Sequence, residues 1–226
     1  MSVVRGVYAR LYRGTGKDYE IDPSIPSGVL ARDLLKRSIW LARGAVRFRS
    51  TAFVGPHVAV RATRRLQLGR MATIEAGCRV DALAPDGVRL GARAKLGAGS
   101  VVSSTRHVST LGVGLVMGDD SSCGEWCYFG AAGGITIGAD VIMGQFVSFH
   151  SQEHVFDDAS EAVRTQGVHS KGIEIGNGTW IGAKATFLDG ARVGANSVVA
   201  AGAVVRGEHP DGAVLAGVPA KVVRQR

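Results

Sequence analysis

The stretch GIEIGNGTWIGAKATFLDGARVGANSVVAAGAVV (172–205) decides the fold, because a large apolar residue recurs in it every six positions. The members of this series are Ile175, Ile181, Phe187, Val193, Val199 and Val205. A period of six fits neither an α-helix nor an uninterrupted strand, whose side chains alternate in twos. It fits a short strand followed by a turn, and three such units close a triangular coil of about 18 residues.

The same spacing extends toward the N-terminus, often with a glycine directly after the apolar residue. The earlier series are Val54 and Val60; Leu68, Ile74 and Val80; Leu90, Leu96 and Val102; and Ile137, Met143 and Phe149. We expect these side chains to point inward and the glycines to permit tight corners. The predicted fold class is therefore all-β, a parallel β-helix whose stacked coils satisfy one another's backbone groups.

The composition supports a solenoid of small, similar layers. Glycine accounts for 32 of the 226 residues, roughly twice the usual ~7%. Proline numbers only 6 and hydrophobic residues make up 46%, which excludes collagen and wholesale disorder. Aromatic residues make up only 6%, so the core must be built mainly from aliphatic side chains.

The sequence shows no membrane-spanning or secretory segment. No apolar run approaches the ~18 residues of a spanning helix, and the N-terminus lacks the pattern of a signal peptide. The three cysteines are odd in number and form no CxxC motif, so we expect buried, reduced thiols. These features predict a cytoplasmic protein.

We divide the chain into an N-terminal extension (1–50), a β-helix (51–206) and a C-terminal tail (207–226). Pro23 and Pro26 predict an irregular segment before residue 27. The β-helix is expected to be looser over residues 103–134, where some coils should be irregular.

A short helix is expected in the N-terminal extension. Ser27 is predicted to cap it, over about 28–47, with one apolar face and basic residues mostly elsewhere. We favour packing of this helix on the β-helix or on a neighbouring subunit. Peripheral association of 28–47 with an anionic membrane surface is the alternative.

A protruding loop is predicted at residues 150–172, which break the repeat entirely. An excursion of this length from a tight solenoid is usually functional or disordered. The loop is rich in histidine and charged residues, so we interpret it as functional. Histidine is the side chain best suited to accept a proton at neutral pH, and it is therefore the candidate general base.

Three stretches together carry a family resemblance: GGITIGADVIMGQFVSFHSQEHVFDD (133–158), the repeat at 172–205, and AGVPAKVVR (216–224). They resemble the left-handed β-helix acyltransferase superfamily. The maltose and galactoside O-acetyltransferases are similar, and the capsule, lipopolysaccharide and exopolysaccharide O-acetyltransferases more so. The resemblance covers about 50–226 and is strongest over 133–224.

The resemblance implies a left-handed β-helix, acetyl-CoA as donor, a sugar or glycan hydroxyl as acceptor, and no required metal. It further implies a homotrimer whose active sites lie between neighbouring subunits. By position it assigns the general base to His154, with His150 as the second candidate and Glu153 as a residue that could orient the imidazole. Transfer is then direct, without a covalent enzyme intermediate.

Acceptor contacts are less well marked. Asp157, Asp158 and Arg164 are candidates for holding sugar hydroxyls, with a solvated loop as the alternative interpretation. Small-sugar acetyltransferases carry an acceptor-binding asparagine where this chain has GEWCYFGAAGG (124–134). The acceptor therefore cannot be transferred from those enzymes.

The resemblance marks the donor site more clearly. Trp180 matches an aromatic residue that packs the pantetheine arm of coenzyme A, and a bulky Trp fits poorly in an aliphatic core. The remaining positions comprise two backbone contacts to that arm, two glycines that keep the groove narrow, and two cations that face the adenosine phosphates. These are, in that order, Ala183 and Ala201, Gly182 and Gly202, and Lys221 and Arg224.

Other functions remain open. A γ-class carbonic anhydrase would need three zinc-binding histidines, for which His107, His150 and His154 could be proposed, but their spacing does not match that family. A non-enzymatic basic module is compatible with the net charge of +8. The basic residues are scattered without an aromatic-interleaved strip, so no nucleic-acid partner is expected. N-acetylation of an amino sugar and transfer of a longer acyl group also stay open.

Overall fold

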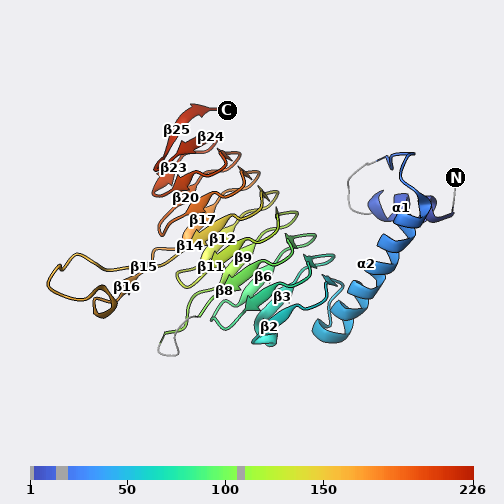
Figure 1. Cartoon of the computed structure of the whole chain (residues 1–226), viewed down its shortest axis with the longest axis horizontal. Coiled ribbons are helices and arrows are strands. Elements are labelled where there is room, and N and C mark those ends of the chain that lie inside the picture. The colour runs from blue at the N-terminus through green and yellow to red at the C-terminus, as the bar shows by residue number, and fades with distance from the viewer. Residues whose placement is uncertain (1–2, 14–19, 106–109) are drawn as a thin grey trace.

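The computed structural model describes residues 3–13, 20–105 and 110–226. A stack of triangular coils forms most of the molecule, and each full coil gives one strand to each of three parallel sheets (Figure 1). This confirms the left-handed β-helix that the six-residue period and the resemblance predicted.

The three sheets are the three faces of the prism, and their strands are listed here for the described residues. Sheet A stacks β1 (Phe53–Val54), β4 (Thr73–Ile74), β7 (Lys95–Leu96), β10 (Ser122–Cys123), β13 (Ile142–Met143), β18 (Trp180–Ile181), β21 (Val198–Val199), β24 (Ala213–Gly217) and β25 (Ala220–Gln225). Sheet B stacks β2 (Ala59–Arg61), β5 (Arg79–Asp81), β8 (Val101–Ser103), β11 (Tyr128–Gly130), β14 (Ser148–His150), β19 (Thr186–Phe187) and β22 (Val204–Val205). Sheet C stacks β3 (Leu66–Leu68), β6 (Val88–Leu90), β9 (Leu115–Met117), β12 (Ile135–Ile137), β17 (Ile173–Ile175), β20 (Arg192–Val193) and β23 (Glu208–His209).

The core consists of the columns that the period predicted. All six members of the series in 172–205 are buried, as are nearly all of the earlier ones. In sheet B the rings of Phe129, Phe149 and Phe187 stack in register, with centroids 5.2 and 4.7 Å apart. Such columns place apolar area from every coil against the next, which is the main source of solenoid stability.

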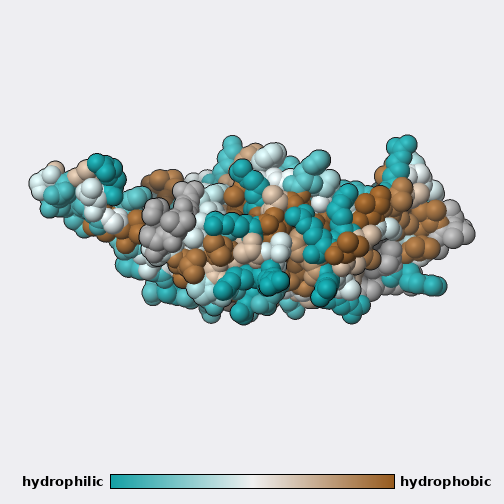
Figure 2. Space-filling view, turned by 90° about the horizontal axis from the view of Figure 1, so that it is seen from below, coloured by the Kyte–Doolittle hydropathy of each residue, from teal (hydrophilic) through white to brown (hydrophobic). Residues whose placement is uncertain are grey.

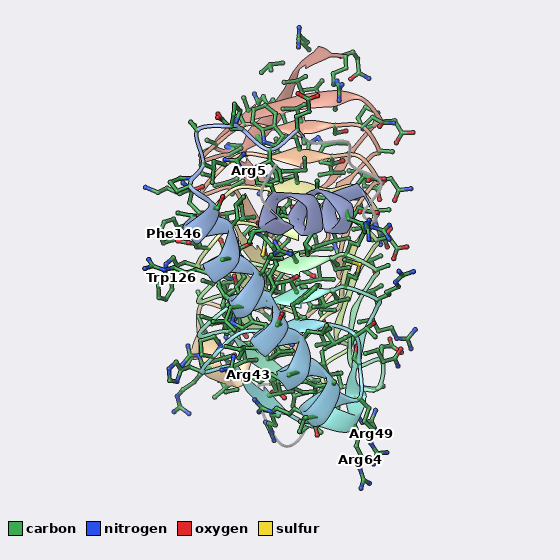
Figure 3. All side chains as sticks on the ribbon, turned by 90° about the vertical axis from the view of Figure 1, so that its right-hand side faces the viewer. Arg5, Arg43, Arg49, Arg64, Trp126 and Phe146 are labelled. Atoms are coloured by element: carbon green, nitrogen blue, oxygen red, sulfur yellow. The ribbon has the colours of Figure 1, made fainter. Side chains whose placement is uncertain are left out.

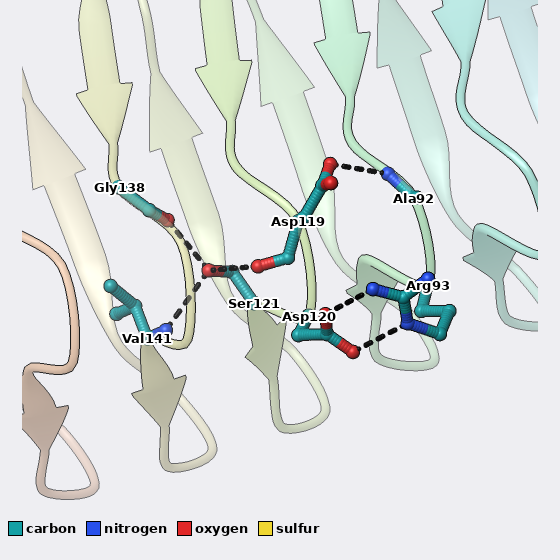
Figure 4. A network of polar contacts seen from close by, with 7 residues as sticks. All are labelled: Ala92, Arg93, Asp119, Asp120, Ser121, Gly138 and Val141. Carbon is teal, nitrogen blue, oxygen red and sulfur yellow. Dashed lines mark hydrogen bonds and ion pairs between the residues drawn. The ribbon is translucent and has the colours of Figure 1, made fainter. Parts of the chain in front are cut away.

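Side chains link successive coils at the corner between sheets C and A, which we call the CA corner (Figure 4). The Oδ1 atom of Asp119 accepts the N–H of Ala92 at 2.7 Å. The hydroxyl of Ser121 donates to the Gly138 carbonyl at 2.6 Å and accepts the Val141 N–H at 2.9 Å. These bonds satisfy backbone groups that the tight turns leave without a strand partner.

The N-terminal extension differs from the prediction in two ways. An amphipathic helix, α1 (Val3–Arg13), lies in the segment expected to be irregular. It is held by tertiary contacts: Tyr8 hydrogen-bonds Asp33, and the Arg5 guanidinium donates to the Pro23 carbonyl at 2.8 Å. These contacts join residues far apart in the sequence, which local patterns do not reveal.

The second helix, α2 (Ser27–Phe48), matches the expected span, but its capping does not. Pro26 is the N-cap residue and no side chain caps the helix, so the assignment of Ser27 as the cap was wrong. Proline fixes the extended φ that an N-cap needs, and Ser27 becomes the first helical residue.

The irregular coils expected over 103–134 are confined to one place. Strands β10, β11 and β12 form a regular coil, and within 103–134 the described residues depart from the repeat between β8 and β9. A single-turn helix, η1 (Thr63–Arg65), marks a corner of the first coil.

The expected loop leaves the prism after β14 and returns at β17. It contains a hairpin of β15 (Glu153–His154) and β16 (Val168–His169) with the short helix η2 (Val163–Thr165) at its tip. The hairpin projects from the side of the prism away from α2 (Figure 1).

Candidate active site

The outer face of sheet A carries an exposed apolar pair near its C-terminal end. Trp180 of β18 is 57% exposed and stands in register beside Ile142 of β13, which is 58% exposed. Ile181, the next residue along, points into the core. Trp180 therefore lies outside the packed interior, as the sequence analysis expected. Together with Ile142 it forms a flat apolar surface on which an apolar segment of a ligand can lie.

A β-bulge aligns the C-terminal cations with this tryptophan. Strands β24 and β25 pair antiparallel, and their register shifts between Val214 and Leu215, so Val214 faces Arg224 and Ala216 faces Lys221. Without the bulge, residues three apart would point to opposite faces of the strand. The shift instead puts both cations on the outer face of sheet A.

Trp180 and Arg224 thus belong to one ladder, which runs through Val198 and Val214. Three strand-to-strand steps separate the two residues, or about 14 Å at ~4.8 Å a step. An aromatic surface at one end and two exposed cations at the other suit a long ligand with an apolar arm and an anionic head.

Backbone donors flank the same ladder at the corner between sheets A and B, which we call the AB corner. At the CA corner, three of the N–H groups that lie two residues after an inward strand residue are capped from the next coil, those of Ala92, Ala139 and Ala195. The corresponding N–H groups of Ala183 and Ala201 on the AB corner have no acceptor among the described residues. They remain available to carbonyl groups of a ligand.

The two predicted glycines serve the fold in different ways. A Cβ on Gly182 would lie 2.4 Å from the Ala201 nitrogen, so coil stacking alone requires glycine there. Gly202 has φ +71° and open space around its Cα. Lys184, which the sequence analysis missed, is exposed beside them at the same AB corner with φ 61°. No sequence motif distinguishes it from other solvated lysines.

The predicted base lies on the hairpin. His154 pairs with Val168 and Glu153 pairs with His169 across β15 and β16. Because successive strand residues face opposite sides, the Glu153 carboxylate lies on the face away from the His154 imidazole. In a single chain Glu153 is therefore not placed to orient His154, and its role stays a prediction.

Asp189 fastens the base of the hairpin to the prism. Its side chain is only 1% exposed, and its carboxylate accepts the N–H groups of Lys171 at 2.8 Å and Gly172 at 2.9 Å. The other contact is His169, whose Nδ1 lies 3.4 Å from Oδ2. The sequence analysis did not identify this anchor, because Asp189 and the Lys171 and Gly172 N–H groups that it accepts lie on different segments and share no local pattern.

The second candidate base, His150, ends β14 and projects from sheet B. Its ring centroid is 5.6 Å from that of Tyr128 on the neighbouring strand, with an interplanar angle of 34°. Two further aromatic residues, Trp126 and Phe146, project one above the other from successive coils at the AB corner (Figure 3). Both are more than half exposed.

The candidate acceptor contacts lie toward the tip of the hairpin. The Oδ1 atom of Asp158 accepts the N–H and hydroxyl of Ser160, at 2.8 and 2.6 Å, and these bonds lower the pKa of the Asp158 carboxyl. Asp157 and Arg164 are exposed, and no hydrogen bond is formed by either side chain within the described residues. The Asp158 carboxylate is therefore already used to stabilise the loop, whereas the side chains of Asp157 and Arg164 are available to a ligand.

A single chain does not bring the candidate base and the candidate donor surface together. The hairpin with His154 leaves the prism at the corner between sheets B and C, and the outer face of sheet A, with Trp180, is the face opposite that corner. A site that uses both residues must therefore be assembled from two copies.

The described residues hold no cluster suited to a metal ion and no exposed thiol. In the described ranges no three His, Cys, Asp or Glu side chains are gathered as for a metal ion, and His107 lies outside those ranges. The three cysteines are free and buried. Burial raises the pKa of the Cys78 thiol to about 11, and the neighbouring Cys123 together with burial raises the pKa of Cys127.

Two family models match the chain. The bacterial transferase hexapeptide model, of six repeats, matches residues 172–207, and the hexapeptide repeat of succinyl-transferase matches residues 72–104. The first contains β18 with Trp180, and the second lies in the N-terminal coils. Both matches report the repeat itself.

Two curated relatives extend the match. A probable acetyltransferase of Mycobacterium tuberculosis is 30% identical over 190 residues, covering 82% of this chain and 54% of the relative. A putative lipopolysaccharide biosynthesis O-acetyl transferase of Escherichia coli is 27% identical over 127 residues, covering 53% of this chain and 65% of the relative. The chain therefore spans between about half and two thirds of these relatives.

Among solved structures, an N-acyltransferase from Bacillus cereus shares the fold. Its complex with dTDP-4-amino-4,6-dideoxyglucose and coenzyme A superposes with a TM-score of 0.53 at 14% identity. The match covers 82% of this chain and 88% of that one. At this identity the likeness concerns the β-helix alone.

Proposed function

Because the chain belongs to the hexapeptide-repeat acyltransferases, we propose that it is an acetyl-CoA-dependent O-acetyltransferase acting on a sugar or glycan hydroxyl. The observation that carries this proposal is the ladder on the outer face of sheet A, from Trp180 to Arg224. The pantetheine arm lies along Trp180 and Ile142. The adenosine phosphates face Lys221 and Arg224, which supply charge-assisted contacts.

The backbone supports the same assignment of the donor. The N–H groups of Ala183 and Ala201, without acceptors inside the described chain, donate to the amide carbonyls of the arm. Two amides recur along pantetheine, and two donors one coil apart match that repetition. The exposed ammonium of Lys184 adds positive charge at the same corner.

We further propose that three copies assemble around a threefold axis, each lending its hairpin to the donor surface of the next. The separation of His154 and Trp180 within one chain supports this arrangement, since neither half of the site suffices alone. A closed ring of identical heterologous contacts gives three equivalent sites.

The proposed reaction is direct. The imidazole of His154 takes the proton from the acceptor hydroxyl as its oxygen forms a bond to the thioester carbonyl carbon. The resulting oxyanion is stabilised by backbone N–H donors. When it collapses, the carbon–sulfur bond breaks and the imidazolium returns the proton to the leaving thiolate, giving the acetyl ester, free coenzyme A and neutral histidine.

The hairpin supplies the acceptor contacts in this proposal. Asp157 and Arg164 hold sugar hydroxyls, because both side chains are exposed and unengaged, while Asp158 shapes the tip through Ser160. The three free cysteines support location of the enzyme in a reducing compartment such as the cytoplasm.

A transfer assay tests the proposal. The protein is incubated with acetyl-CoA and, separately, with neutral sugars, amino sugars and lipid-linked glycans, and free thiol and acetylated product are measured. Acetyl ester on a glycan hydroxyl is the expected product. Amide product on an amino sugar alone would replace O-transfer by N-transfer, and thiol release without any acceptor dependence would contradict both.

A further inference from the structure

Helix α2 carries an apolar stripe that nothing in the described chain covers. Leu35, Ile39 and Val46 are 63%, 47% and 87% exposed. Their spacing of four and seven residues places them on one side of the helix, and the exposed Ala31 and Ala42 continue the same line. A stripe of this length on an exposed helix is a docking surface rather than a scatter of single residues.

Only one end of α2 is fastened to the prism. A Cβ on Gly44 would meet the Ala52 carbonyl, and the Arg47 guanidinium donates to the Val58 carbonyl at 2.7 Å. Toward its N-terminus the helix diverges from the coils, with α1 beside it (Figure 1). At 22 residues α2 is about 33 Å long. Its contacts with the prism begin at Arg37, which lies 5.7 Å from the centroid of the Phe53 ring, and the N-terminal half of the helix stands clear of sheet A.

Positive charge is concentrated in the N-terminal part of the chain, which holds α2 and the first coils. The basic residues are therefore not evenly scattered, contrary to what the sequence analysis had supposed. Residues 1–95 hold eighteen Lys and Arg against seven Asp and Glu, whereas residues 96–226 hold nine against twelve. Arg49 and Arg64 project from the free end of the prism (Figure 3). The surface seen from that side interleaves apolar and hydrophilic patches (Figure 2).

Three of these cations form no ion pair within the described residues, and Lys36 lies 4.5 Å from the centroid of the Trp40 ring. Arg32 and Lys36 border the apolar stripe and are exposed. Within the described ranges no carboxylate forms an ion pair with Arg32, Arg49 or Arg64. Unpaired cations beside an exposed apolar stripe suit the interface of an anionic lipid bilayer. There, arginine and lysine side chains reach the headgroups, and aliphatic side chains enter the acyl layer.

We propose that α2 and the first coils dock on the surface of an anionic phospholipid bilayer. Leu35, Ile39 and Val46 enter the acyl boundary, and Arg32, Lys36, Arg49 and Arg64 contact lipid phosphates. The docking is peripheral, since no described helix is long and apolar enough to cross a membrane. A second copy of the chain is a less favourable partner for this surface, because the two positively charged surfaces would repel each other.

Vesicle co-sedimentation of the full chain tests the proposal. Phosphatidylcholine vesicles that contain phosphatidylglycerol are compared with vesicles of phosphatidylcholine alone, at low and high salt. We expect binding to the anionic vesicles, at least tenfold weaker binding to the neutral ones, and weakening with salt as charges are screened beyond ~10 Å at 0.1 M. Equal binding to both vesicles, or none to either, overturns the proposal.

Paired variants locate the surface. Leu35→Ser with Ile39→Ser should reduce anionic-vesicle binding about tenfold or more, whereas Leu41→Ser, 38% exposed on the opposite side of α2, should leave it unchanged. Arg32→Gln with Lys36→Gln should weaken binding and flatten its salt dependence. All five positions are exposed, so the fold should survive, and acetyl transfer to a water-soluble acceptor should be unaffected. If the Leu35 and Ile39 variant instead lowers the particle mass in sedimentation equilibrium, the stripe is covered by a second copy and the membrane proposal is wrong.

Discussion

Trp180 and Arg224 stand on one outward-facing ladder of sheet A, three strand steps apart, although 44 positions separate them in the sequence. The bulge between Val214 and Leu215 creates this alignment. The six-residue repeat by itself determines the position of Trp180. A cation reaches the same ladder because the chain reverses after β24 and β25 pairs antiparallel with it. Donor recognition in our account depends on both ends.

Replacing the aromatic end should weaken donor binding. For Trp180→Ala we expect the Kd for coenzyme A to rise about tenfold or more, because truncating a large aromatic contact typically costs over 1 kcal/mol. Isothermal titration calorimetry measures the change. Trp126→Ala removes a similarly exposed indole from a coil farther down the prism and should leave the Kd unchanged; an equal effect of both would contradict the assignment.

Replacing the cationic end should remove the recognition of phosphate. Lys221→Gln with Arg224→Gln should weaken coenzyme A binding about tenfold, but dephospho-coenzyme A much less, because that ligand lacks one phosphate contact. Arg192→Gln is the matched control. This arginine lies on sheet C, where it pairs with Glu174 and Glu208. If the double variant and the control behave alike, the phosphates lie elsewhere.

Loosening the hairpin should slow catalysis without affecting the donor. In Asp189→Asn the amide keeps one acceptor oxygen but loses the charge that faces the Lys171 and Gly172 N–H groups. We expect kcat to fall about 10- to 100-fold, as small misplacements of a catalytic group do, with an unchanged Kd for coenzyme A. Hydrogen exchange should rise at 153–154 and 168–169. Asp158→Asn, at the exposed tip, should alter neither exchange at those residues nor donor affinity.

The buried thiols should be unreactive in the native protein. The pKa of Cys78 is raised to about 11, so at pH 8 this thiol keeps its proton and the reactive thiolate is scarce. Cys127 shifts in the same direction. The hydrogen bond with Cys127 lowers the pKa of Cys123, so that thiol is protected by its burial alone. Titration with a chromogenic disulfide should release almost no colour at pH 8 and count three thiols after denaturation. Rapid reaction of any cysteine in the native state would show that the core opens.

Hybrid assemblies should recover activity if sites are shared. His154→Ala and Trp180→Ala each damage one half of a site, so at low acetyl-CoA both are slow. Co-expression of the two variants should restore up to about a quarter of the sites, those that combine an intact hairpin with an intact donor surface from its neighbour. Activity that never exceeds the mean of the two variants would mean that both residues act within one chain.

The sequence predicted those parts of the molecule that repeat. A six-residue period needs no long-range information, because each coil buries its aliphatic residues against identical neighbours, and Ile181 and Val199 were therefore placed correctly. Helix α1 was missed because Arg5 and Tyr8 hold it through tertiary contacts. Ser27 was given a capping role that Pro26 fills.

The site was predictable only in outline. Motif positions suggested Trp180 and His154, but the strand alternation that puts Glu153 on the face away from His154 depends on where the hairpin pairs. The anchor formed by Asp189 joins a loop to a coil that follows it in the sequence. Such pairings follow from the fold and have no local sequence signal.

The kinetics of His154→Ala test the central claim most directly. With acetyl-CoA and an accepting glycan, we predict that kcat falls about 10²- to 10⁴-fold while the Kd for coenzyme A stays at the parental value, because the general base is lost and the donor surface is not. His150→Ala, which removes the neighbouring histidine, should retain most of its turnover. Normal turnover by His154→Ala together with a collapse in His150→Ala would contradict the account.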